Sequence, residues 1–163
     1  MTTTYESSAV QSIFDLKEAL EALPSNSRLS HAEIDTLYAM AYQLVSQGRY
    51  ETASQYFALL TLYRPTNVNY LQGMALCHRQ LERYAEALNL YSFLAVIDPE
   101  NMDHEVAIAE CLMLQSEFDE ARETVDRNLQ CFHESSREDK SADRARVLQE
   151  RLDARFNSVS IGD

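Results

Sequence analysis

The chain has 163 residues, of which 45% are hydrophobic and 25% are charged, enough for one domain with a sizeable core. Its 26 acidic residues outnumber its 14 basic ones and give a formal net charge of −12, which argues against nucleic acid as a partner because such a partner needs clustered Lys and Arg. The three glycines and three prolines are too few for a fold made of many tight turns, so the composition favours helices.

Residues 1–29 are predicted to form an N-terminal helix and a linker. The helix covers about residues 8–23, where apolar residues recur at helical spacing, and "PSNSR" at 24–28 is typical of a turn. Two interpretations of this helix stay open, an intramolecular cap and a surface for self-association, and the interface candidates are Ile13, Phe14, Leu16 and Leu20. The opening "MTTTYESSAVQ" has neither a basic start nor an apolar core, so neither a signal peptide nor a membrane anchor is expected.

Residues 30–133 contain a pattern that recurs every 34 residues and gives three units, 34–67, 68–101 and 102–135. Residues at the same position in the three units form one column of the repeat. Alanine fills two columns of the repeat, and aromatic or bulky residues fill two more: Ala41, Ala75 and Ala109; Ala53, Ala87 and Ala121; Tyr50, Tyr84 and Phe118; Phe57, Tyr91 and Val125. Pro65 and Pro99 close the first two units. This interval and residue pattern are those of the tetratricopeptide repeat.

Each repeat is predicted to be a pair of antiparallel helices, at 34–47 with 50–64, 68–81 with 84–98, and 102–115 with 118–132. The alanines let the two helices approach closely, and the prolines end the second helix of a pair. Ser30 and Glu33 have capping-box spacing, so the first repeat helix is expected to begin near His31. One unit cannot bury its own apolar face, and the expected fold is therefore all-α, with three tetratricopeptide repeats in a right-handed solenoid.

The last part of the chain, 134–163, is predicted to be a charged C-terminal helix and tail. A capping helix is expected at 137–156, where one stripe carries Ala145, Leu148, Leu152 and Phe156. Residues 157–163 are expected to be a frayed end.

A second stripe on the first helix of each repeat predicts a groove for an extended apolar peptide. In the first repeat it consists of Tyr38, Tyr42 and Val45, at i, i+4 and i+7. A tyrosine can bury its ring against a ligand and keep its hydroxyl in water. The alternative is that Tyr38 and Tyr42 pack on the N-terminal helix. The matching groove positions of the other repeats are Asn69, Gln72, Leu76, Arg79, Val106, Glu110 and Met113, with Asp35 and Asp103 on the same line.

No catalytic residue, cofactor or metal site is expected. Cys77 and Cys111 occupy the same repeat column and are interpreted as small core residues, and the odd number of cysteines argues against a disulfide framework. Cys77 and His78 are adjacent on a helix and therefore point about 100° apart, which disfavours a shared metal. The sequence contains no glycine-rich phosphate loop and no nucleophile with a matching base, so an enzyme is not expected.

Three segments resemble the class II chaperones of type III secretion translocators, the SycD/LcrH-type family: "LYAMAYQLVSQGRYETASQYFALLTLY", "LQGMALCHRQLERYAEALNLYSFLAVID" and "AIAECLMLQSEFDEAR". The resemblance covers about residues 30–133. Its most specific features are the "LY" and "AY" of the first repeat, the spaced Gly, Cys, Leu, Tyr and Ala of the second, and "AECL" in the third.

The resemblance implies a chaperone in the cytosol of a Gram-negative bacterium. Such chaperones keep hydrophobic translocator proteins soluble and competent for secretion without inserting stably into a membrane, and a short extended client segment lies in the concave groove. Tyr38, Tyr42 and Val45 match groove positions of the family. Some members also bind a transcriptional activator, and members often form homodimers through N-terminal regions. The alternatives are a generic tetratricopeptide scaffold for other proteins and a co-regulator of a transcriptional activator.

Overall fold

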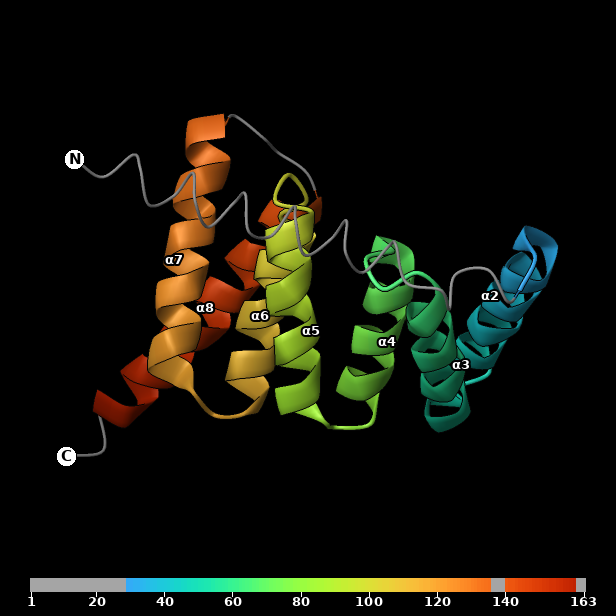
Figure 1. The fold of residues 1–163 in the computed structure, drawn as a ribbon. Coiled ribbons are helices and arrows are strands. Elements are labelled where there is room, and N and C mark those ends of the chain that lie inside the picture. The colour runs from blue at the N-terminus through green and yellow to red at the C-terminus, as the bar shows by residue number, and fades with distance from the viewer. Residues whose placement is uncertain (1–28, 136–139, 161–163) are drawn as a thin grey trace. The chain divides into compact units, whose positions relative to one another are not determined.

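A computed structural model describes residues 29–135 and 140–160 of the chain, and within these ranges every regular element is an α-helix (Figure 1). The helices are α2 (His31–Ser46), α3 (Tyr50–Tyr63), α4 (Val68–Gln80), α5 (Tyr84–Ile97), α6 (Asp103–Leu114), α7 (Phe118–Ser135) and α8 (Lys140–Ser160). The chain divides into two compact units between Leu81 and Glu82. The first unit holds α2 to α4 and the second holds α5 to α8.

The six predicted repeat helices are all present, and the all-α class is confirmed. α3 and α5 end two residues before Pro65 and Pro99, as expected for residues that cannot continue the helical hydrogen-bond ladder. The boundary between the units falls inside the predicted second repeat, so the pairing of α4 with α5 stays a prediction. The predicted helix at 8–23, with its four interface candidates, lies outside the described residues.

The C-terminal helix differs from its prediction. It was expected at 137–156 with a frayed end at 157–163, but α8 continues to Ser160. The sequence reasoning ended the helix at Phe156 because the apolar stripe ends there. The residues that follow, "NSVS", contain no helix-breaking Gly or Pro, so nothing in them forces the helix to stop.

The start of α2 confirms the predicted capping box. The Ser30 Oγ accepts a hydrogen bond from the Glu33 backbone N–H at 3.3 Å, and the Glu33 carboxylate accepts one from the Ser30 backbone N–H at 2.8 Å. The hydrogen bonds from Ser30 hold the pKa of the Glu33 carboxyl below its usual value. These two side chains therefore set the first residue of α2 at His31.

The core of the first unit is centred on the ring of Phe57. The repeat alanines Ala41 and Ala53 are fully buried between α2 and α3. Gly73 on α4 faces the same ring, and a Cβ atom at this position would overlap it. Gly73 therefore lets the backbone of α4 lie directly against Phe57.

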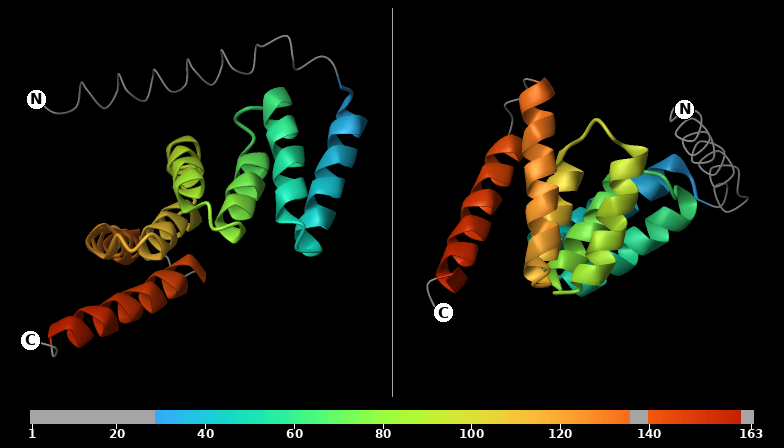
Figure 2. Two further views of the ribbon diagram at one scale, coloured as in Figure 1. Left: turned by 90° about the horizontal axis from the view of Figure 1, so that it is seen from below. Right: turned by 90° about the vertical axis from the view of Figure 1, so that its left-hand side faces the viewer.

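The core of the second unit is shared by α6, α7 and α8. Figure 2 shows α8 running beside α7. The stripe predicted for the C-terminal helix is largely inside, since Ala145, Leu148 and Leu152 are buried against α6 and α7. Phe156 is partly buried against the same cluster. Two cation–π contacts join the last part of α8 to the start of α7. Arg155 lies 3.8 Å from the Phe118 ring centroid, and Arg122 lies 4.9 Å from the Phe156 ring centroid.

The turns after α2, α4 and α6 share one backbone feature. Gly48, Glu82 and Ser116 occupy the same repeat column, and all three have positive φ values, of 72°, 60° and 68°. After α2 and α6 the turn is a Schellman motif, in which the N–H of Arg49 donates to the carbonyl of Leu44 at 2.9 Å and the equivalent N–H of Glu117 donates to that of Leu112 at 2.9 Å. Only the first of these turns uses glycine, the residue that adopts this conformation without strain.

Candidate ligand-binding face

Four aromatic rings from three helices meet around Tyr38 in the first unit, and we call them the aromatic cluster. The ring centroid of Tyr38 lies 5.4 Å from that of Tyr70 on α4, 6.3 Å from that of Phe57 on α3, and 6.4 Å from that of Tyr42 one turn along α2. All three distances lie in the range in which aromatic rings attract one another. The cluster therefore ties the face of α2 that carries Tyr38 and Tyr42 to the two helices beside it.

Burial decreases through the aromatic cluster from Phe57 to Tyr42. Phe57 is 1% exposed and Tyr70 is buried, whereas Tyr38 is half-buried and Tyr42 is 64% exposed. Burial raises the pKa of the Tyr70 hydroxyl, and this effect outweighs the opposing charge of Arg64. Because the net shift is upward, the hydroxyl stays neutral at physiological pH. An exposed aromatic ring on a rigid aromatic base is a favourable contact for an apolar ligand, because its rotamers are restricted before binding.

Seven of the predicted groove residues belong to the first unit, on α2 and α4. Val45 is half-buried and packs against the core, so it offers part of its side chain to solvent. On α4, Asn69 is exposed, whereas three others are partly buried: Gln72, Leu76 and Arg79. The exposed part of this set is thus aromatic on α2 and mainly polar on α4.

One predicted groove residue of the third repeat does not reach the surface. Val106 was expected to line the groove, but it is 0% exposed and belongs to the core of the second unit. Met113 is partly buried against the same core. The reason is α8, whose buried Ala142, Ala145 and Leu148 complete the cluster that contains Val106. The prediction is therefore wrong for Val106, which is a core residue.

The two acidic residues that the third repeat contributes to the predicted line, Asp103 and Glu110, are bound by a side chain of α8. Arg144 donates to Glu110 from Nε at 3.1 Å and from Nη2 at 2.8 Å, and from Nη1 to Asp103 at 2.8 Å. Ser141 donates a further hydrogen bond to Asp103 at 2.8 Å. Desolvation lowers the pKa of Arg144, but the hydrogen bond and charge of Glu110, with the charge of Asp103, outweigh it and raise that pKa. Arg144 is therefore a fixed positive charge that ties α8 to α6.

Sequence reasoning missed Tyr70, which supports the aromatic cluster in the first unit, and Arg144, which ties α8 to α6 in the second unit. Tyr70 lies next to the predicted line, and its column holds Thr36 in the first repeat and His104 in the third, so no shared residue type marks it. Arg144 lies outside the repeats. The available signal for Arg144 was the pair Asp103 and Glu110, two acids a helical heptad apart on one face, which call for a cation nearby.

Other kinds of site find little support in the described part of the chain. Within residues 29–135 and 140–160, no three His, Cys, Asp or Glu side chains are grouped so that they could hold a metal ion. In the same ranges, none of the helices combines the length and apolar character needed to cross a bilayer. Cys77 and Cys111 are buried in the cores, as predicted, and Cys131 is exposed.

Comparison with protein families identifies the repeats. Two family models, both described as "Tetratricopeptide repeat", match residues 34–67 and 78–137, which together make up more than half of the chain. The chain belongs to the tetratricopeptide repeat family, as its period and its alanine columns predicted.

Curated relatives come from species of Yersinia and Salmonella. The chain is 26% identical over 95 residues to "Low calcium response locus protein H" of Yersinia pestis, which covers 58% of this chain and 56% of that protein. It is 27% identical over 99 residues to "Chaperone protein SicA" of Salmonella dublin, which covers 61% of this chain and 56% of that protein. The matches thus span little more than half the length of these relatives.

Solved structures with the same fold include translocator chaperones. The translocator chaperone SycD of Yersinia enterocolitica has a TM-score of 0.69 at 22% identity, over 80% of this chain and 90% of that one. PcrH in complex with the chaperone binding region of PopD has a TM-score of 0.69 at 24% identity, over 79% and 97%. A type III secretion complex from Aeromonas hydrophila has a TM-score of 0.73 at 18% identity, over 90% and 98%. The resemblance that the repeat segments indicated is therefore confirmed.

Proposed function

We propose that this chain is a cytosolic chaperone for hydrophobic translocator proteins of a type III secretion system, and that it binds them without catalysing a reaction. The observation that carries this proposal is the exposed Tyr42 on the buried base of the aromatic cluster. The named relatives support it, because one is a SicA chaperone and the similar structures include PcrH bound to a segment of PopD and SycD bound to a peptide of YopD.

The client segment is proposed to be extended and apolar, and to lie along α2 and α4. Tyr38 and Tyr42 would cover its apolar side chains, while the polar residues of α4, such as Asn69 and Gln72, would bond its backbone. A segment with few charges suits this surface, because the exposed rings offer no partner for a buried ion. Val106 takes no part in the proposed face, since it is a core residue and offers no surface.

Binding of this kind needs no nucleotide. A chaperone that binds the unfolded client segment lowers the concentration of free client by mass action, so protection should rise with the ratio of chaperone concentration to Kd. The strong negative charge of the chain would keep the complex soluble, as like-charged particles repel one another. A second copy of the chain is a further proposed partner, with Ile13, Phe14, Leu16 and Leu20 as interface candidates; a dimeric form of SycD is among the similar structures.

The proposal is tested by co-expression with each translocator encoded by the same organism. We expect the translocator to move from the insoluble to the soluble fraction and to elute together with the chain in size-exclusion chromatography. A translocator that stays insoluble and does not co-elute would contradict the chaperone role. If the chain instead co-elutes with a soluble transcriptional activator and with no translocator, the alternative of a co-regulator would replace it.

A further inference from the structure

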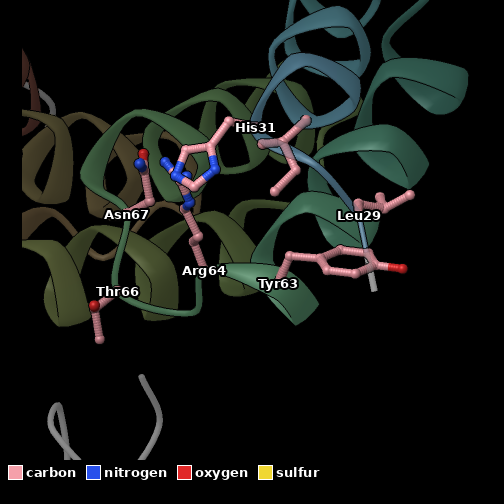
Figure 3. A pocket seen from close by; sticks show the side chains of 7 residues that line it. Leu29, His31, Tyr63, Arg64, Thr66 and Asn67 are labelled. Carbon is pink, nitrogen blue, oxygen red and sulfur yellow. The ribbon is translucent and has the colours of Figure 1, made fainter. Parts of the chain in front are cut away.

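A cavity of about 500 Å³ lies in the first unit. It is formed by Leu29, two residues before α2, and by the start of α2, the end of α3 and the turn that leads into α4. The residues used below are Leu29, His31, Ile34, Tyr63, Arg64 and Asn67 (Figure 3). Neither Tyr38 nor Tyr42 lines this cavity, so it is a separate feature from the proposed client face.

The cavity has one apolar side and one side rich in nitrogen donors. Leu29, Ile34 and the ring of Tyr63 form the apolar side, and Ile34 is itself buried. Figure 3 shows the side chains of His31, Arg64 and Asn67 gathered together on the other side, whereas the Tyr63 hydroxyl points away from them. A ligand that fills the cavity therefore meets an apolar wall and a group of donors at the same time.

The donors on that side are available to a ligand. Asn67 accepts a hydrogen bond from the Tyr70 backbone N–H with its Oδ1 at 3.3 Å, which leaves its NH₂ group as the end that can donate elsewhere. Arg64 is close enough to the Tyr70 hydroxyl to act on it electrostatically, and its guanidinium has five N–H donors, so several remain for a ligand. Among the described residues, no carboxylate lies within ion-pair distance of Arg64. The arrangement calls for an acceptor with negative charge.

Two acidic side chains of α2 limit the strength of such binding. Asp35 is exposed and close enough to act on Tyr70 electrostatically, and Glu33 is engaged by Ser30. Their charges, with the net charge of the chain, oppose a multiply charged ligand more strongly than a singly charged one. A single carboxylate with an apolar neighbour is the chemistry that fits both sides of the cavity.

We infer that this cavity binds a carboxylate joined to an apolar group, with His31, Arg64 and Asn67 on the carboxylate and Leu29, Ile34 and Tyr63 around the apolar part. Two sources have this chemistry, the C-terminal residue of a peptide and a small free carboxylic acid. The inference goes beyond the proposed chaperone function and does not depend on it.

Isothermal titration of the full chain with four probes tests the inference. The small probes are N-acetyl-leucine and its amide, and the large probes are a ten-residue peptide that ends in leucine, with a free or an amidated C-terminus. We expect each acid to bind about tenfold more tightly than its amide, because only the acid carries the charge. Equal binding of acid and amide, or no binding of any probe, would overturn the inference. Tighter binding of the peptide acid than of N-acetyl-leucine identifies a protein C-terminus as the source, and the reverse identifies a small acid.

Four variants locate the binding in this cavity. Arg64→Met is expected to remove the preference for the acid, and His31→Gln to reduce it about threefold. Asp35→Asn is expected to tighten acid binding two- to threefold, because it removes an opposing charge. Arg49→Met is the matched control, since Arg49 is exposed and does not line the cavity. An acid preference that survives in Arg64→Met while the melting curve stays native would place the binding elsewhere.

Discussion

Arg144 on α8 binds Glu110 on α6 through two nitrogens, at 3.1 and 2.8 Å, and thereby ties the C-terminal helix to the third repeat. The pair is partly exposed, so its contribution to stability is modest. We expect Arg144→Gln to lower the free energy of unfolding by about 1 kcal/mol, since it also breaks the bond to Asp103. Urea unfolding followed by circular dichroism measures this loss.

Arg146→Gln is the control for that experiment. Arg146 has an ion pair with Asp143 of the same helix at 2.9 Å, and both side chains are well exposed. Its replacement should change the free energy of unfolding by less than about 0.5 kcal/mol. Equal losses for the two variants would mean that Arg144 does not tie the helices together.

Gly73 and Phe57 should behave as a coupled pair. A methyl group at position 73 would overlap the buried Phe57 ring, so we expect Gly73→Ala to destabilise the chain by about 1–3 kcal/mol even though alanine is the better helix former. Phe57→Leu shortens the side chain, and Gly73→Ala should then cost clearly less in that background. A double-mutant cycle of urea unfolding measures the coupling, and purely additive effects would contradict the contact.

In each of the three turns with positive φ, glycine should be the more stable residue, so adding it and removing it should have opposite effects. Glu82 and Ser116 are exposed, and in each the backbone has a left-handed conformation that a side chain disfavours. We expect Glu82→Gly and Ser116→Gly each to raise the free energy of unfolding by about 0.5–1 kcal/mol, and Gly48→Ala to lower it by about 1 kcal/mol. The thermal midpoint should move in the same direction as the free energy. Calorimetry of the three variants checks the signs, and a loss of stability in Glu82→Gly would contradict the assigned backbone.

The cysteines should differ in reactivity. Burial raises the pKa of the Cys77 thiol from 9.0 to about 11, whereas Cys131 is exposed. With a disulfide reagent at pH 8 we expect one fast thiol, which Cys131→Ser removes, and two slow ones that react on unfolding. Fast reaction of all three thiols would contradict the buried placement.

Because the unfolded chain releases the Cys77 proton near pH 9 and the folded chain only near pH 11, the free energy of unfolding should fall as the pH rises between these values.

The repeat architecture was predictable because each signal is local. Ser30 with Glu33 sets the start of α2 through contacts three residues apart, and the prolines set the ends of α3 and α5. The buried alanine columns follow from a period that the sequence displays directly. Such signals depend on neighbours along the chain and need no knowledge of the tertiary fold.

The candidate site was predictable only for residues that no helix outside the repeats covers. Tyr42 is exposed as the stripe predicted, but the same rule placed Val106 on a surface and the packing of α8 buries it. The support that Tyr70 gives to Tyr38 comes from another helix at a spacing that no repeat column encodes. Both features depend on which helices meet, and this is the information that one sequence does not contain.

The most direct test of the central claim compares the proteins captured from the native cytosol by three forms of the chain. Wild type, Tyr42→Glu and Gln43→Glu are each used as bait, and the captured proteins are identified by mass spectrometry. Both positions are exposed, so neither change should unfold the repeats, and Gln43→Glu adds the same charge one residue away.

We expect wild type and Gln43→Glu to capture hydrophobic translocators and Tyr42→Glu to lose at least about 90% of them, because a carboxylate on the aromatic cluster must be desolvated by an apolar client. Capture of translocators at the wild-type level by Tyr42→Glu would contradict the assigned face. Capture of soluble scaffold or regulatory proteins alone, by all three forms, would contradict the chaperone function itself.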